Sequence, residues 1–220
     1  MSAAKKDVPA ASPNTAGKQY ITLKHEAHIE FEERKSIFLG HAKSVKTEED
    51  AAAFVNSMKR EYSDASHNVS AYQILSGAVA RYSDDGEPHG TAGAPVLNVI
   101  KQSGAEDIVV VVTRYFGGIL LGAGGLVRAY SATAKLALDA AEISVLDEYI
   151  CLSFSCSYSE YQKIQNELPK FGAAVEDADF ADSVNVKTAV KEAVLSDFRA
   201  RISDITNGAA EIIEYDRKFA

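Results

Sequence analysis

The 220-residue sequence has no tryptophan, only two cysteines and no long apolar run. No segment approaches the ~18 consecutive apolar residues that a membrane-spanning helix requires, so we expect no contact with a membrane. Cys151 and Cys156 are five residues apart on a strand pattern, and side-chain alternation places such positions on opposite faces of a strand. We therefore expect neither a disulfide bond nor a shared metal, and we expect both thiols to be inert.

Charge is distributed unevenly along the chain. Residues 1–18 contain lysines, prolines and small residues without periodicity, which predicts a disordered tail, and they lack the apolar core of a secretory signal. We therefore expect a cytoplasmic protein. The net charge is −4 over residues 20–145 and −6 over residues 146–220. Because the overall field is acidic, RNA contact would need a local basic patch, and no DNA specificity is expected.

Hydrophobic periodicity predicts two domains that each mix helices and strands, at residues 19–145 and 146–220. In the first domain a helix is expected to begin at Thr47, because acidic residues follow in the first turn and favour the positive end of the helix dipole. A buried strand from Asp107 to Val112, a glycine-rich loop and a helix from Leu126 to Ala141 complete this domain. The second domain has the element order βαββαβ, which is that of a ferredoxin-like split βαβ unit.

The most informative segment reads TRYFGGILLGAGGLVRAYS, from Thr113 to Ser131. Glycine permits positive φ and close approach, and a helix N-terminus presents unpaired N–H groups to an anion. This combination predicts a shaped surface for a small anionic ligand, although tight packing of helix against sheet would also explain the glycines. Neither a P-loop nor a dinucleotide-binding glycine pattern is present. The candidate binding residues are Arg114, Tyr115, Gly117, Gly118, Gly122, Gly124, Gly125 and Arg128.

A second candidate is the acidic turn that contains Asp84, Asp85, Glu87 and His89. Its three carboxylates could bind a hard cation such as Mg²⁺ or Ca²⁺, but their spacing matches neither an EF-hand nor a zinc site. The alternative is a hydrogen-bonded turn in which Asp84 and Asp85 accept backbone N–H groups. We favour this structural interpretation and expect no metal and no other cofactor.

An enzyme is the alternative function. Asp85, Glu87, His89 and His67 are the candidate acid–base groups, and the glycine segment would hold a phosphorylated or carboxylated small molecule. A lone histidine such as His67 is more often a structural donor, and no Ser–His–Asp set is evident. The hypothesis also requires the acidic turn to lie within ~10 Å of Arg114, because acid–base groups must reach the reacting atom.

Four motifs in this order resemble the signature of the Impact/YigZ family: HN at 67–68, SDDGEP at 83–88, GTAG at 90–93 and RYFGG through LGAGGLVRAY at 114–130. The resemblance covers about residues 20–145, and the C-terminal part resembles the ferredoxin-like domain of bacterial YigZ-type members. It implies an α+β fold, in which the first domain has the left-handed βαβ topology of elongation factor G domain IV. The second domain resembles domain V of that factor.

The resemblance also implies a function. Eukaryotic members named Impact regulate translation through protein–protein contact in the starvation-sensing kinase pathway, and bacterial members have been linked to nucleic acid or ribosome binding. We therefore favour a non-catalytic binding module, active in translation or its regulation, that holds RNA, the ribosome or a protein partner. Lys35 would join Arg114 and Arg128 as a cation of this surface.

Three positions depart from the family pattern. Leu120 and Ile37 stand where the family often has lysine and arginine, which removes positive charge and weakens the nucleic-acid interpretation. Val69 stands where cysteine is common, which removes thiol chemistry there.

Overall fold

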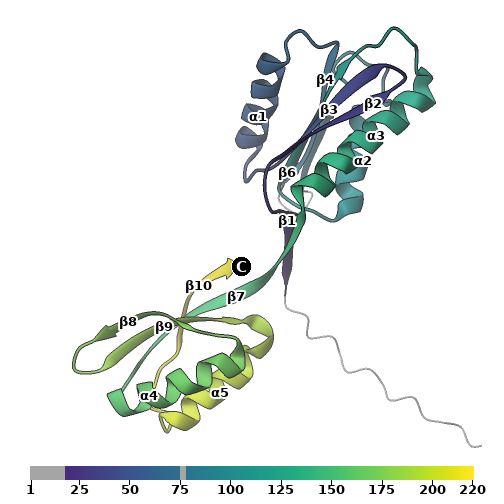
Figure 1. Ribbon diagram of the computed structural model, residues 1–220. Coiled ribbons are helices and arrows are strands. Elements are labelled where there is room, and N and C mark those ends of the chain that lie inside the picture. Colours follow the sequence, from purple (N-terminus) through teal and green to yellow (C-terminus); the bar gives the residue numbers. More distant parts are fainter. Residues whose placement is uncertain (1–17, 75–77) are drawn as a thin grey trace, which may run out of the picture. The chain divides into compact units, whose positions relative to one another are not determined.

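The computed structural model describes residues 18–74 and 78–220, so the predicted disordered tail lies outside the described residues except for Lys18. The chain divides into two compact units (Figure 1). The first spans Tyr20–Leu146, and the second contains Asp147–Ala220 together with Gln19. Both units mix helices and strands, which confirms the predicted α+β class. No helix within the described ranges combines the length and hydropathy needed to cross a membrane.

The first unit is built on a five-stranded sheet with the order β2-β3-β6-β4-β5, in which every neighbouring pair is antiparallel. An additional strand, β1 at Gln19–Leu23, pairs with β7 at Ile143–Cys156, the strand that contains the boundary between the units. The five strands are β2 at Ala27–Glu33, β3 at Ser36–Ser44, β4 at His67–Ile74, β5 at Val79–Ser83 and β6 at Ile108–Tyr115.

Strand β6 explains why this sheet is covered on both faces. Its consecutive apolar side chains alternate, so that Val110 and Val112 enter one core while Val109 and Val111 enter another. The first core lies beneath α2 (Gly93–Ser103) and α3 (Gly122–Ala141), and the second lies beneath α1 (Glu48–Glu61). Figure 1 shows α1 on one face of the sheet and α2 and α3 on the other.

The structure confirms one predicted helix start and corrects another. Helix α1 follows the predicted N-cap Thr47, whose hydroxyl accepts the backbone N–H of Asp50 at 3.1 Å. The predicted start of α3 at Leu126 is wrong, because the helix begins one turn earlier, at Gly122. Glycine has a low helix propensity, so sequence patterns place the start too late. Three of the candidate glycines therefore lie in the first turn of a helix, and only residues 116–121 form a loop.

The second unit has the predicted ferredoxin-like order. Its strands are arranged β8-β9-β7-β10, and all neighbouring pairs are antiparallel. Ser157 begins the first helix with a capping box to Glu160. Cys156 belongs to the core and Cys151 faces the other side of β7; both are free, and burial raises the pKa of both thiols. The remaining elements are α4 (Tyr158–Glu167), β8 (Val175–Phe180), β9 (Val184–Lys191), α5 (Leu195–Ile205) and β10 (Ile213–Phe219), with short 3-10 turns at Leu168–Phe171 and Glu192–Val194.

Candidate functional site

Asp84 of the acidic turn caps helix α2. Its carboxylate accepts the backbone N–H groups of Gly90 at 2.9 Å, Gly93 at 2.8 Å and Ala92 at 3.3 Å. Burial alone would raise the pKa of Asp84, but these hydrogen bonds together lower it. His89 lies beside this carboxylate, with Nδ1 3.6 Å from it, and its side chain is almost fully exposed. Asp84 is therefore a structural capping residue.

Asp85 connects the same turn to two other elements. Its carboxylate contacts Nζ of Lys59 at 2.5 Å and accepts the backbone N–H of Asn68 at 2.6 Å. Its own carbonyl oxygen lies 2.9 Å from Nδ1 of His67. These contacts hold the turn against α1 and β4, as expected of a hydrogen-bonded turn. They also fix the orientation of the His67 ring.

Glu87 and Arg114 form a buried ion pair. Nη1 of Arg114 donates to Oε1 of Glu87 at 2.6 Å, and the hydroxyl of Tyr130 donates to the same oxygen at 2.7 Å. Nε2 of His67 lies 3.8 Å from this oxygen. Burial, together with the hydrogen bond to Glu87, raises the pKa of Tyr130. The acidic turn and Arg114 are therefore in direct contact, and His67 lies beside them.

Aromatic rings enclose the Arg114 guanidinium. Its central carbon lies 5.5 Å from the ring centre of Phe38 and 5.5 Å from that of Phe116. A weak hydrogen bond of 3.4 Å also links it to Oγ of Ser36. Arg114 is 5% exposed. The charge that the sequence suggested for an external anion is thus neutralised inside the unit.

The candidate metal ligands do not converge. Asp84 faces the start of α2, Asp85 faces Lys59, and Glu87 faces Arg114. Across the described part of the chain, no group of three or more His, Cys, Asp or Glu side chains is arranged to hold a metal ion.

The candidate glycines have different roles. Gly117 is in tight contact with the turn between β2 and β3, because a Cβ atom there would lie 2.0 Å from the carbonyl group of Lys35. Gly118 and Gly122 have positive φ angles of 82° and 68°. Gly124 has open space where a Cβ would lie, and at Gly125 a Cβ would meet the neighbouring Leu121 at 3.0 Å. Among these candidate glycines, only Gly117 mediates a close approach between distant segments.

An open pocket of about 430 Å³ lies above the ion pair. Two exposed apolar side chains, Phe116 and Leu120, line this pocket. Together with the other exposed apolar side chains between residues 116 and 127 they form what we call the apolar rim, namely Phe116, Ile119, Leu120 and Val127. Leu120 is 82% exposed, and the others are 37–48% exposed. The pocket is lined by His67, Gly86, Glu87, Pro88, Arg114, Phe116, Leu120, Leu121, Gly122, Ala123 and Leu126.

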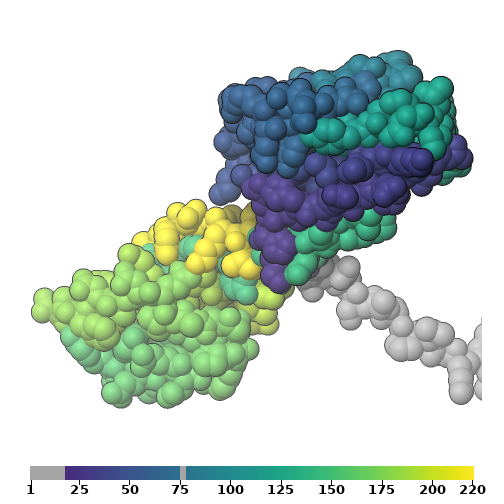
Figure 2. Space-filling model, turned by 45° about the horizontal axis from the view of Figure 1, so that its top comes forward, coloured from purple at the N-terminus to yellow at the C-terminus, as the bar shows by residue number. Residues whose placement is uncertain are grey.

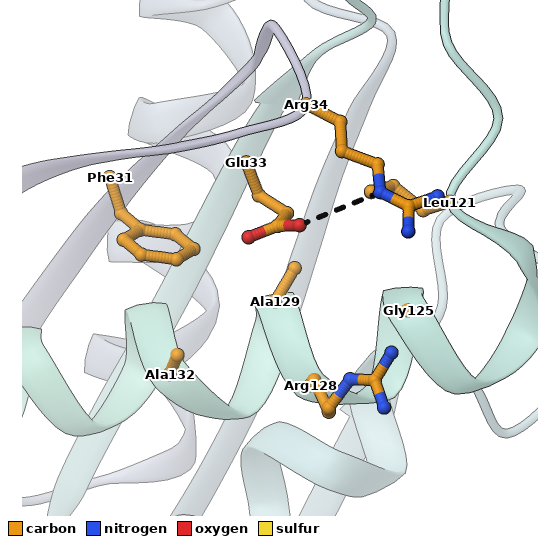
Figure 3. A pocket seen from close by; sticks show the side chains of 8 residues that line it. All are labelled: Phe31, Glu33, Arg34, Leu121, Gly125, Arg128, Ala129 and Ala132. Carbon is orange, nitrogen blue, oxygen red and sulfur yellow. Dashed lines mark ion pairs between the residues drawn. The ribbon is translucent and has the colours of Figure 1, made fainter.

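The remaining candidates, Tyr115, Lys35 and Arg128, do not line this pocket. Tyr115 is partly buried, and its hydroxyl donates to Asp64 at 2.9 Å. Lys35 is exposed in the turn between β2 and β3. Arg128 is exposed and lines a separate crevice with Arg34 (Figure 3). Sequence reasoning missed Tyr130 and Phe38 as partners of the ion pair, and it missed Arg34.

Comparison with known proteins identifies the family. Residues 34–138 match the Impact N-terminal domain, and residues 154–209 match the Domain of unknown function (DUF1949). The chain is 37% identical over 198 residues to "IMPACT family member YvyE" of Bacillus subtilis, which covers 89% of this chain and 90% of that protein. The chain belongs to the IMPACT family.

Other IMPACT family members are similar over both units. "IMPACT family member YigZ" of Escherichia coli is 34% identical over 188 residues, covering 82% of this chain and 90% of that protein. A solved structure titled "Crystal structure of an hypothetical protein" is 31% identical with a TM-score of 0.56, covering 90% of this chain and 98% of that one. The resemblance inferred from the four motifs is thereby confirmed.

Proposed function

We propose that this IMPACT family member is a non-catalytic binding module that acts in translation or its regulation, and that its apolar rim holds a protein surface. The exposure of Leu120, at 82%, carries the proposal. Exposed apolar side chains gathered within a short segment, here residues 116–127, are typical of a protein interaction site. Phe116, at the edge of the same pocket, supplies an aromatic ring of the kind that is enriched at such interfaces.

Protein is favoured over RNA as the partner because of where the charges lie. Single-strand RNA binding combines stacking rings with cations that follow the phosphates. Here Phe116 stacks on Arg114, whose charge is already paired with Glu87. The rim itself presents apolar side chains.

The test is co-sedimentation of the full chain with ribosomes over a salt series. Wild-type protein is expected to sediment with ribosomes, with little dependence on salt, because apolar contacts are not screened. Leu120→Asp is expected to weaken this association at least tenfold. Leu136→Asp is the matched control, because Leu136 is an exposed leucine of the same unit, 43% exposed, that does not line the pocket.

Each outcome has a defined meaning. Absence of wild-type sedimentation at low salt would contradict the link to translation. An equal loss in both leucine variants would show that the rim is not the contact. A steep fall of affinity with salt would indicate phosphate contacts and therefore RNA.

The convergence of the acidic turn on Arg114 supports one alternative, an enzyme that acts on a phosphorylated or carboxylated small molecule. His67, with its ring fixed by the Asp85 carbonyl, would be the acid–base group at the pocket wall. The paired Glu87 would repel an anion, so we rank this function second. A thermal-shift screen with nucleotides, sugar phosphates and divalent ions tests it, because ligands that bind the native state raise its melting temperature.

A further inference from the structure

A second hollow lies between β2 and α3, and we call it the arginine crevice. It has a volume of about 160 Å³ and is lined by Arg34, Glu33 and Phe31 on one side and by Arg128 and small helix residues on the other. The β2–β3 hairpin and α3 run side by side along this part of the surface (Figure 2). Figure 3 shows the guanidinium groups of Arg34 and Arg128 facing the same opening, near Gly125.

Arg34 and Arg128 differ from Arg114, which is buried and paired with the carboxylate of Glu87. Arg34 has one carboxylate near it, Glu33 at 3.8 Å, and the Arg34 side chain is 56% exposed. Arg128 is exposed, and no carboxylate of the described residues pairs with it. Two guanidinium groups that converge on one opening, with a single carboxylate paired to one of them, favour an external anion.

Small residues on α3 create the space for that anion. Gly125, Ala129 and Ala132 recur at helical spacing beside β2, and all three line the crevice. Phe31 closes the crevice with an aromatic ring. The site therefore offers apolar contacts as well as two cations, which suits a carboxylate on a short hydrocarbon stem.

The charge of the lining selects a monoanion. Arg34 and Arg128 contribute two positive charges, and Glu33 contributes one negative charge. The resulting charge of +1 complements a carboxylate, whereas a phosphate dianion would leave excess negative charge beside Glu33.

The arginine crevice adjoins the pocket of the apolar rim, because Leu121 lines both. We propose that the crevice binds the side-chain carboxylate of an acidic residue in the same protein segment whose apolar residue docks on the rim. This inference rests on the proposed function for the identity of the partner, and it defines that partner as an apolar and acidic segment.

The experiment uses three probes with the full ¹⁵N-labelled chain: a blocked peptide containing leucine and glutamate, the same peptide with glutamine, and inorganic phosphate. NMR follows the side-chain Nε–Hε signals of the arginines. The glutamate peptide is expected to shift the Arg34 and Arg128 signals with one common Kd, at least fivefold below that of the glutamine peptide and of phosphate. Arg128→Gln and Arg34→Gln are each expected to weaken binding at least fivefold.

Arg81→Gln is the matched control, because Arg81 is an arginine of similar exposure, 64%, that lies on β5 and pairs with Glu48. It is expected to leave binding unchanged. Equal shifts with the glutamate and glutamine peptides would overturn the proposal, as would tighter binding of phosphate. So would a loss of binding in Arg81→Gln as large as that in Arg128→Gln.

The two proposals fail separately. Peptide binding at the crevice without ribosome sedimentation would contradict the role in translation and leave the carboxylate site in place. Conversely, ribosome association that persists in an Arg34→Gln, Arg128→Gln double variant, together with absent peptide binding, would remove the crevice and leave the rim.

Discussion

The floor and the edge of the pocket at the apolar rim differ in the kind of side chain that each one buries or exposes. At the floor, Glu87 and Arg114 are charged and almost completely buried, at 8% and 5% exposure. At the edge, Leu120 is apolar and is the most exposed large hydrophobic side chain of the described residues. Folding normally gives the opposite distribution, with charges in water and leucines inside.

The floor is held by contacts within the folded chain, whereas the rim has apolar surface that no contact among the described residues covers. Glu87 and Arg114 are each held by internal hydrogen-bond or ring partners, and of their side-chain polar atoms only Nε of Arg114 is buried without one. The rim has exposed apolar surface that only another molecule can cover. If this distinction is correct, substitutions at the floor will change folding stability, and substitutions at the rim will change binding alone.

The largest effect is expected from Glu87→Gln. The substitution leaves the Arg114 guanidinium buried without a countercharge, which should lower the free energy of unfolding by about 3–5 kcal/mol. Urea denaturation of the full chain, followed by a probe in the first unit, measures it. The double variant Glu87→Leu, Arg114→Met should lose less than Glu87→Gln alone, because no unpaired charge remains. A loss below ~1 kcal/mol for the single variant would mean that the floor is not a structural pair.

Two glycines near the pocket are expected to differ in how much their substitution by alanine changes folding stability. Gly117→Ala would place a Cβ atom 2.0 Å from the backbone of Lys35, so β2–β3 and the loop must move apart. We expect a loss of about 2 kcal/mol or more in thermal or urea unfolding. Gly124→Ala meets open space in the first turn of α3 and should be neutral or stabilise by up to ~1 kcal/mol. Similar losses in both variants would contradict the assigned roles.

The opposite face of the sheet provides a buried polar group of another kind. His41 is 1% exposed, stacks on Tyr62, and contacts His28 Nδ1 to Nδ1 at 2.7 Å. Burial, and the neighbouring His28, lower the pKa of His41 from 6.5 to about 4. The unfolded chain therefore binds more protons between these values, so stability is highest above pH 6.5 and falls as the pH decreases toward 4.

Urea unfolding over a pH series measures this dependence. We expect His41 to account for roughly 1–3 kcal/mol of the stability lost between about pH 7 and pH 4.5. His41→Phe should flatten the curve, whereas His89→Gln should not, because the His89 side chain is 93% exposed. An unchanged slope in His41→Phe would place the acid sensitivity elsewhere, with His28 and Glu26 as the nearest titratable groups.

Local chemistry in the sequence predicted the elements that depend on it. The N-cap at Thr47, the continuous apolar strand β6 and the βαββαβ order of the second unit all agree with the structure. The predicted start of α3 is wrong because the glycines of its first turn have low helix propensity and so give no helix signal in the sequence. Helix propensity is a weak guide to the start of a helix, because the tertiary context can override it.

The site was less predictable because it depends on distant contacts. The sequence identified Glu87, Arg114 and His67 as candidate site residues. It could not show that the Glu87 carboxylate neutralises the Arg114 guanidinium. Arg34 and Arg128 are almost a hundred positions apart, and only the pairing of β2 with β3 beside α3 brings them to one crevice. Such convergence is a property of topology, which a single sequence does not display.

The smallest effect on folding is expected at the rim. Leu120→Asp exchanges a residue that is 82% exposed, so little buried area is lost and the free energy of unfolding should change by less than ~0.5 kcal/mol. The same urea experiment that detects Glu87→Gln should therefore show coincident curves for Leu120→Asp and wild type. Because the variant also loses ribosome association under the proposal, unchanged folding with lost binding would assign the rim to recognition. A destabilisation comparable to that of Glu87→Gln would instead mean that Leu120 is covered within the folded chain, and the contrast between floor and rim would disappear.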